Sequence, residues 1–135
     1  MVHSWFISSE DFHKKKETKI LNWLDLSTET VYNITKISVR ETPAFVDGIS
    51  YILSLEDREA NRLRVWGSRR LVHEIIDKRG KDERVYLISL GQERYQKNKT
   101  INNYDLTFEK TGAPIKILDD EAKHKISQAN NLQKV

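Results

Sequence analysis

The sequence predicts a mainly β domain, a five-stranded barrel in which a single helix lies between the third and the fourth strand. Three observations support this prediction. Five segments between residues 30 and 110 are rich in β-branched residues or alternate hydrophobic with polar residues, as half-buried strands do. Within residues 30–110 the period changes to that of a helix once, between residues 68 and 80. Glycine, proline or clustered polar residues separate the segments.

The N-terminal part, residues 1–29, is expected to be a helical extension with a helix over about residues 10–23. Apolar residues there can share one helical face, and a serine stands where an N-cap is needed. The residues concerned are Phe12, Ile20, Trp23 and Leu24 on the face, and Ser8 or Ser9 at the cap. Lysines 14–16 are interpreted as the solvated side of this helix in preference to a phosphate clamp.

The domain itself is expected to span residues 30–110. The predicted elements are, in order, strands at Val31–Arg40, Ile49–Leu55 and Arg62–Trp66, a helix capped by Ser68 and ending near Gly80, a strand at Val85–Leu90, a polar loop at Gln92–Asn102 and a strand at Tyr104–Phe108. Aromatic residues on inward-reading positions or in apolar strands are assigned to the core, namely Tyr32, Tyr51, Tyr86, Tyr104 and Phe108.

The C-terminal part, residues 111–135, is expected to be a partly flexible extension. It begins with a short apolar run, Ile115–Leu118, after which Asp119 and Asp120 can cap a short helix. Residues 128–131 are polar and are expected to be poorly ordered.

Composition excludes several functional classes. The 135 residues include 23 Lys and Arg, 20 Asp and Glu, and no cysteine, so disulfides, thiolate metal sites and cysteine nucleophiles are excluded. The four histidines lack ligand spacing and no glycine-rich phosphate loop is present, so we expect no enzyme, no metal and no cofactor. No apolar run reaches the roughly 20 residues of a membrane helix, and no signal peptide is recognisable. We therefore expect an intracellular protein that is neither secreted nor membrane-bound.

The order of elements resembles the OB-fold, a five-stranded Greek-key barrel with a helix between strands three and four. Two local features strengthen the resemblance: Val65-Trp66-Gly67-Ser68 leads into the helix, and Leu90-Gly91 leads into a basic loop. The pattern resembles that of small OB domains of single-stranded DNA-binding and replication protein A-like proteins, including those of DNA viruses and mobile elements. The resemblance implies binding of single-stranded DNA in replication, recombination or repair, in the nucleus or cytoplasm.

The third strand supplies the main candidate binding residues. Leu63 and Val65 belong inside by alternation, so Arg62, Arg64 and Trp66 point outward. An outward tryptophan offers a stacking platform for a base, and the arginines offer phosphate contacts. The alternative is that Trp66 packs over the barrel end beneath the N-terminal helix. A slip of one residue would also reverse the assignment.

Further candidates lie on the neighbouring strands and on the two loops that flank this face in the proteins it resembles. They are Lys36 and Arg40 on the first strand, Ser50 and Ile52 on the second, Phe45 in the first loop, Arg69 at the helix start, and Arg94, Tyr95, Lys97 and Lys99 in the last loop. A bulge near Thr35 would alter the first-strand set. For Phe45 a buried packing role is an equal alternative, and for the last loop the alternative is an ordinary hydrophilic connection.

Two functional hypotheses follow. The first is a sequence-tolerant single-stranded DNA-binding protein, with RNA as an alternative ligand. The second is a protein-interaction or assembly module that uses the terminal extensions for a protein partner or a homo-oligomer. The modest net charge of +3 favours the second somewhat, because many nucleic-acid-binding proteins are more basic.

Overall fold

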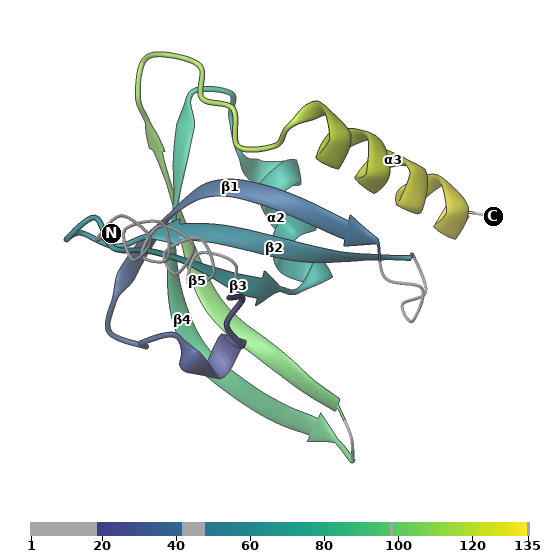
Figure 1. The fold of residues 1–135 in the computed structure, drawn as a ribbon, viewed down its shortest axis with the longest axis horizontal. Helices are drawn as coiled ribbons and strands as arrows, with labels where there is room; N and C mark the ends of the chain where they lie inside the picture. Colours follow the sequence, from purple (N-terminus) through teal and green to yellow (C-terminus); the bar gives the residue numbers. More distant parts are fainter. Residues whose placement is uncertain (1–18, 42–47, 98, 135) are drawn as a thin grey trace, which may run out of the picture.

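The computed structural model describes residues 19–41, 48–97 and 99–134 (Figure 1). Its elements are the 3-10 helix η1 (Trp23–Asp25), the strands β1 (Val31–Glu41), β2 (Ile49–Glu56) and β3 (Arg62–Gly67), the helix α2 (Arg69–Lys78), the strands β4 (Glu83–Gln96) and β5 (Lys99–Lys110), and the helix α3 (Asp120–Lys134). The predicted order of three strands, a helix and two strands is confirmed. The side chain of Ser68 accepts the N–H of Leu71 at 3.2 Å, so the predicted cap of α2 is also confirmed.

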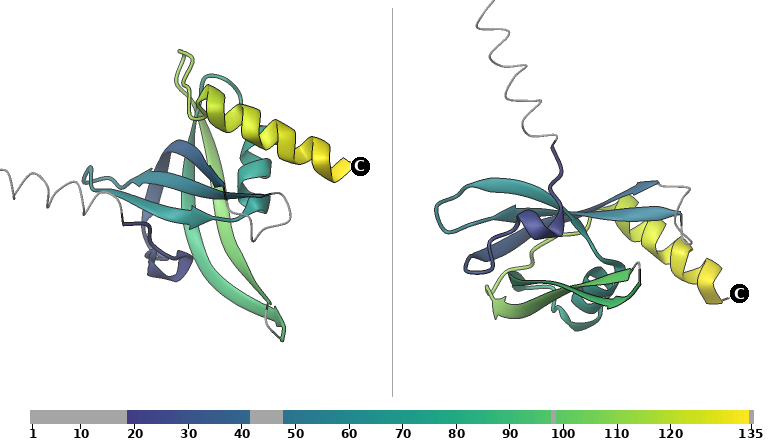
Figure 2. Two further views of the ribbon diagram at one scale, coloured as in Figure 1. Left: turned by 45° about the vertical axis from the view of Figure 1, so that its right-hand side comes forward. Right: turned by 90° about the horizontal axis from the view of Figure 1, so that it is seen from below.

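The five strands form one antiparallel sheet in the order β3-β2-β1-β4-β5. The sheet curls, so that β1, β2 and β3 form one layer while β4, β5 and α2 lie on the other side of the core (Figure 2). Fully buried side chains from both layers fill the space between them, including Leu53, Val65, Leu71, Val85 and Leu87. Each buries most of its apolar surface, which is the main stabilising term in a domain of this size.

The sheet is not closed into the predicted barrel. Strands β3 and β5 are its two edges, and no ladder joins them within the described residues. The edge of β3 is occupied by Leu21, whose N–H donates to the carbonyl of Arg64 at 2.8 Å and whose carbonyl accepts from the N–H of Trp66 at 3.0 Å. These bonds satisfy main-chain groups at the edge of β3, so the chain before β1 covers this edge at Leu21.

Trp23 fills the gap between this edge and the other layer. Its side chain is 2% exposed, its indole N–H donates to the carbonyl of Gly91 at 3.1 Å, and its ring packs edge-on against Tyr104. The predicted helix over residues 10–23 lies largely outside the described residues. Its described end, from Lys19 onward, is not α-helical: the prediction is wrong there, because pairing with β3 requires extended backbone at Leu21.

A β-bulge at Thr35 divides β1 into two parts. The pairing register shifts between Ile34 and Lys36, which allows Ile34 and Ile37 both to point into the core. Before the bulge β1 pairs with β4, and beyond it the N–H of Ile37 donates instead to the carbonyl of Ile117 at 2.8 Å. The C-terminal apolar run therefore lies along β1.

The helix α3 follows directly and packs on β1. Its predicted cap is confirmed, because the carboxylate of Asp119 accepts the N–H of Ala122 at 2.7 Å. Ala122 and Ile126 are buried. The helix α3 includes residues 128–131 and continues to Lys134, and the expectation of poor order there stays a prediction.

Two further predictions about β4 and β5 are wrong. The expected loop at 92–102 is largely a paired hairpin, in which Gln92 faces Asn102 and Arg94 faces Thr100. Main-chain pairing sustains this hairpin without alternating hydrophobic residues, so the pattern does not reveal it. Tyr86 is not in the core, because Val85, Leu87 and Ser89 occupy the inward positions of β4. The predicted burial of Tyr32 and Tyr51 is confirmed, and Tyr104 and Phe108 pack against the core.

Candidate nucleic-acid interface

The register of β3 places the main candidates on one surface. Val65 is fully buried and Leu63 packs against the core, so Arg62, Arg64 and Trp66 lie on the other face of the strand. Pairing between β2 and β3 runs from Glu56 to Tyr51 without a register shift. A slip that would reverse the assignment is therefore not present, and the outward assignment agrees with the structure.

The neighbouring strands extend this surface in rows. Trp66 faces Ile52, which faces Ser38, and Arg64 faces Ser54, which faces Lys36. Arg40 faces Ser50 in the next row. We call this surface the outer face; it consists of Lys36, Ser38, Arg40, Ser50, Ile52, Ser54, Arg62, Arg64 and Trp66.

Ser50 and Ile52 do not offer the accessible contact surface that the alternation predicts. They belong to the outer face by register, but they are only 8% and 4% exposed. Ile52 is flanked by Trp66, and Ser50 is flanked by Arg40 and donates to its carbonyl at 3.4 Å. The larger neighbouring side chains therefore form the reachable surface, with the two smaller residues at its floor.

Trp66 and Arg40 meet on this surface although they come from strands that are not adjacent in the sheet. The guanidinium carbon of Arg40 lies 5.6 Å from the centroid of the Trp66 ring, which is cation–π distance. The indole is partly exposed. A guanidinium held against an indole keeps its charge and leaves donors at its edge, so the pair combines an aromatic surface with a cation.

The remaining cations of the outer face differ in how their charge is balanced. Arg62 is largely exposed and pairs with Glu56 at 3.2 Å, and Lys36 lies 3.9 Å from Asp119. Exposed pairs of this kind contribute about 0–1 kcal/mol and exchange partners readily. Arg64 is partly buried, and its Nε has no hydrogen-bond partner among the described residues. Arg64 stands two residues from Trp66 on the same face of β3, so its charge adds to the positive potential beside the indole.

The two arginines at the start of α2 have different surroundings. Arg69, the predicted contact, is partly buried directly after the end of β3. Arg70 donates to the carbonyl of Asn102 at 2.9 Å and lies over the ring of Tyr104 at 5.1 Å. Arg70 thus holds α2 against β5.

Tyr104 also bonds to α2. Its hydroxyl donates to the carboxylate of Glu74 at 2.7 Å, and this bond is the main reason why the pKa of Glu74 lies below its ordinary value of 4.5. Burial, followed by the bond to Glu74, raises the pKa of Tyr104. The contacts of Arg70 and Tyr104 fix the base of the β4–β5 hairpin relative to α2.

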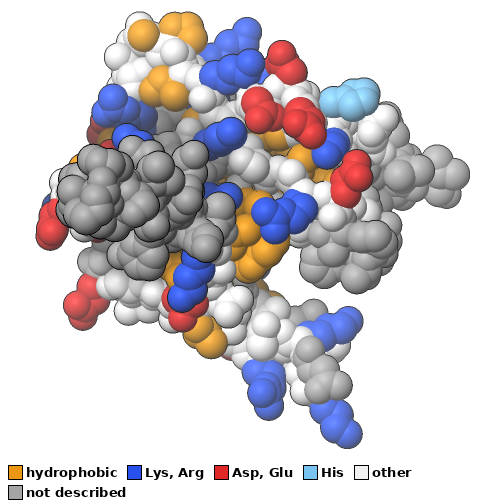
Figure 3. Space-filling view, viewed as in Figure 1, with side chains coloured by type: hydrophobic (Ala, Val, Ile, Leu, Met, Phe, Trp, Pro, Cys, Tyr) orange, Lys and Arg blue, Asp and Glu red, His pale blue; other side chains and the backbone are white. Residues whose placement is uncertain are grey.

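The hairpin carries exposed cations at its end: Arg94, Lys97 and Lys99. Figure 3 shows the molecule hollowed between this hairpin and the body, with basic and hydrophobic side chains at the edge of the hollow. The backbone of Tyr95 lies in β4, while its side chain and the whole of Phe45 fall outside the described residues. The structure thus brings seven of the predicted residues together: five form the reachable surface of the outer face, and two lie buried beneath them. The reachable residues are Lys36, Arg40, Arg62, Arg64 and Trp66, and the buried ones are Ser50 and Ile52.

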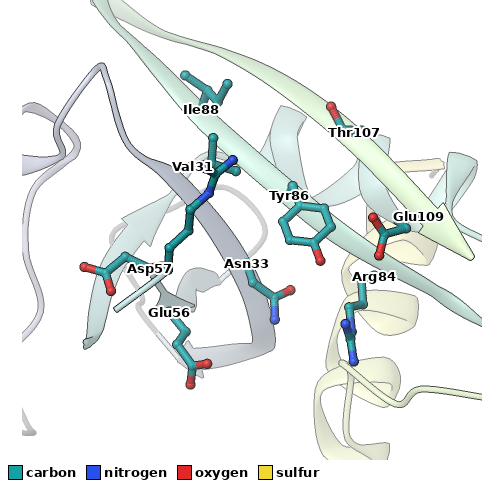
Figure 4. Close-up of a pocket in the computed structure, with 10 residues that line it drawn as sticks. Val31, Asn33, Glu56, Asp57, Arg84, Tyr86, Ile88, Thr107 and Glu109 are labelled. Carbon is teal, nitrogen blue, oxygen red and sulfur yellow. The ribbon is translucent and has the colours of Figure 1, made fainter. Parts of the chain in front are cut away.

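One further surface feature is not among the predictions made from the sequence. Where the sheet curls from β1 onto β4 and β5, a groove of about 650 Å³ is lined by Tyr86 and Ile88 among others (Figure 4). The signal for it is the alternation of Val85, Leu87 and Ser89, which leaves Tyr86 and Ile88 on the opposite face. The groove is not predicted from the sequence because Tyr86 is assigned to the core.

Within the described residues, no three His, Asp or Glu side chains are grouped so that they could hold a metal ion. None of the helices in that part of the chain is both long enough and apolar enough to cross a membrane. Comparison with protein-family models, with curated proteins and with solved structures yields no match. Function is therefore inferred from the geometry of the outer face and its surroundings.

Proposed function

We propose that this chain is an OB-fold-like binding protein for single-stranded nucleic acid, with DNA preferred, and that it acts in replication, recombination or repair without a catalytic step. The sheet order and the position of α2 support the OB-fold interpretation, with the segment from Leu21 to Leu26 standing where β3 and β5 would otherwise close a barrel. In OB proteins that bind nucleic acid, the outer side of strands two and three is the binding surface.

The observation that carries the proposal is the pairing of Trp66 with Arg40, with Arg64 in the adjacent row. A base that stacks on the exposed part of the indole gains about 1–3 kcal/mol, whatever its identity. Arg40 lies over part of the indole and Arg64 lies in the adjacent row, so a base would stack on the part of the ring that Arg40 leaves open and its phosphates would pass the two guanidinium groups. Stacking therefore supplies the sequence-independent part of the affinity and the arginines supply its dependence on salt.

The β4–β5 hairpin supports the same placement of a single strand on the outer face. Its cations Arg94, Lys97 and Lys99 are exposed near the end of the hairpin, and Figure 3 shows basic side chains on the hairpin beside the hollow. A strand crossing Trp66 toward this hollow would meet positive charge at both ends. Phosphate contacts there add affinity without adding base selectivity.

A titration of a fluorescein-labelled 15-nucleotide oligothymidine at several salt concentrations tests the proposal. Trp66→Ala should weaken binding about 5- to 100-fold, which corresponds to the loss of one stacked base. The matched control is Tyr86→Ala, which removes a half-buried aromatic residue from the groove and should leave oligonucleotide affinity within twofold.

Two double variants test the electrostatic contribution to oligonucleotide binding. Arg62→Gln with Arg64→Gln should lower the salt slope by about 0.7 for each phosphate of the single strand that these side chains neutralise. Arg58→Gln with Arg84→Gln removes the same charge from the groove and should leave the slope unchanged. Absence of wild-type binding at low salt refutes the proposal, as does equal weakening by the outer-face variants and their controls. Repeating the titration with oligouridine measures the preference for DNA.

A further inference from the structure

The groove at the curl of the sheet is a second recognition surface. Its floor consists of residues paired across three strands: Asn33 faces Tyr86, which faces Thr107, and Val31 faces Ile88. One wall is the turn between β2 and β3, and the other is formed where Arg84 faces Glu109. Figure 4 shows Tyr86 and Asn33 projecting from neighbouring strands into the space between these walls.

The turn that forms the first wall is held rigidly by its own hydrogen bonds. The carboxylate of Asp57 accepts the N–H of Glu59 and the N–H of Asn61, both at 2.9 Å, and the side-chain amide of Asn61 at 3.1 Å. The amide of Asn61 contributes most to lowering the pKa of Asp57. Because these bonds are internal to the turn, the wall keeps its shape without an occupant, as preformed binding sites do.

The charge of the groove is opposite to that of the outer face. A smaller hollow of about 330 Å³ shares Val31, Asp57 and Arg58 with it. Together the two are lined by five acidic residues against two arginines, and because Glu56 also pairs with Arg62 at 3.2 Å the local balance is −2 in a chain whose total charge is +3. The acidic residues are Glu29, Glu56, Asp57, Glu59 and Glu109. The negative potential disfavours nucleic acid here and favours a cationic ligand.

We propose that this acidic groove docks a lysine- or arginine-rich segment of a protein partner. An apolar side chain of the segment covers Tyr86 and Ile88, and its cations reach Glu59 and Glu109 on the two sides. Because the two hollows share lining residues, an extended segment of several residues could occupy both. This inference does not depend on the proposed nucleic-acid function, since the two surfaces carry opposite charge and use different side chains.

The test is a fluorescence anisotropy titration of the whole chain with a labelled peptide, Lys-Lys-Leu-Lys-Leu-Lys-Lys, and with a control peptide in which glutamate replaces every lysine. The expected result is saturable binding of the lysine peptide in the micromolar range at low salt, weakened about tenfold or more by Glu59→Lys with Glu109→Lys. Both side chains are exposed, so the double variant should fold. Tyr86→Ala should weaken the peptide severalfold because it removes the apolar surface that the leucines cover.

The matched control is Asp77→Lys with Glu121→Lys, which makes the same charge change at exposed positions on α2 and α3, away from the groove. This control should leave peptide affinity nearly unchanged. Three results would each overturn the proposal: no saturable binding of the lysine peptide, equal binding of the glutamate peptide, or equal weakening by the control and groove variants. Displacement of the bound peptide by oligothymidine would contradict the separation of the two surfaces.

Discussion

The role of Trp23 in holding the two layers together can be measured with the substitution Trp23→Phe. Phenylalanine retains an aromatic ring for the edge-on contact with Tyr104, whose ring centroid lies 6.4 Å away, but it cannot donate to the carbonyl of Gly91. Loss of that hydrogen bond costs about 1 kcal/mol. The space left by the smaller ring at a position only 2% exposed costs about 1 kcal/mol more. The free energy of unfolding should therefore fall by about 2 kcal/mol.

Urea denaturation followed by circular dichroism gives this quantity, and the slope of the transition should stay unchanged. Leu24→Ala is the matched control, because Leu24 lies in the same 3-10 helix but is 67% exposed; it should change stability by less than about 0.5 kcal/mol. Hydrogen exchange adds a local readout: protection of the Trp66 N–H, which donates to Leu21, should fall with Trp23→Phe. A loss of stability no greater than that of Leu24→Ala would refute the view that Trp23 closes the gap between β3 and β4.

Three further substitutions test other contacts. Gly67→Ala should destabilise the fold by about 1–3 kcal/mol in urea melts, because the added Cβ would lie 2.9 Å from Cγ of the fully buried Leu53. Tyr104→Phe should cost about 1–2 kcal/mol near neutral pH. Since the pKa of Glu74 is lowered in the folded state, this stabilisation is present above pH 4.5 and is lost as pH falls through the lowered pKa, so stability measured against pH should decline less steeply in acid for the variant. Asp119→Ala removes the cap of α3 and should lower the stability of this helix by about 1 kcal/mol. The measurement is amide hydrogen exchange, which should become faster in the first turn of α3.

Local sequence patterns are sufficient to predict most of the strands and the orientation of the side chains of β3. Leu63 and Val65 alternate with Arg62, Arg64 and Trp66, and no bulge interrupts their pairing with β2, so period two gives the correct face. The cap at Ser68 is also predictable, because capping depends on residues within one turn. These are the cases in which neighbours in sequence determine the structure.

The remaining features depend on contacts between distant residues. Helical spacing places Trp23 on an apolar helix face, but its partners are Gly91 and Tyr104, which no periodicity near residue 23 indicates. The aromatic character of Tyr86 and its apolar strand suggest a core position, although its neighbours Val85 and Leu87 already fill the inward positions. Both errors arise because tertiary packing overrides a local preference.

The bulge at Thr35 connects the core of the protein with its candidate interface. Counted in steps of two from the inward Ile34, Lys36, Ser38 and Arg40 would point into the core, and Ile37 would point to solvent. The extra residue reverses this phase: Ile37 is fully buried, and Arg40 reaches the ring of Trp66. The hydroxyl of Thr35 donates to the carbonyl of Ser54 at 3.2 Å, which ties the bulge to β2. The same residue that lets β1 contribute apolar side chains on both sides of the bulge therefore also places its cations beside Trp66, so the binding surface and the core of β1 depend on one register shift.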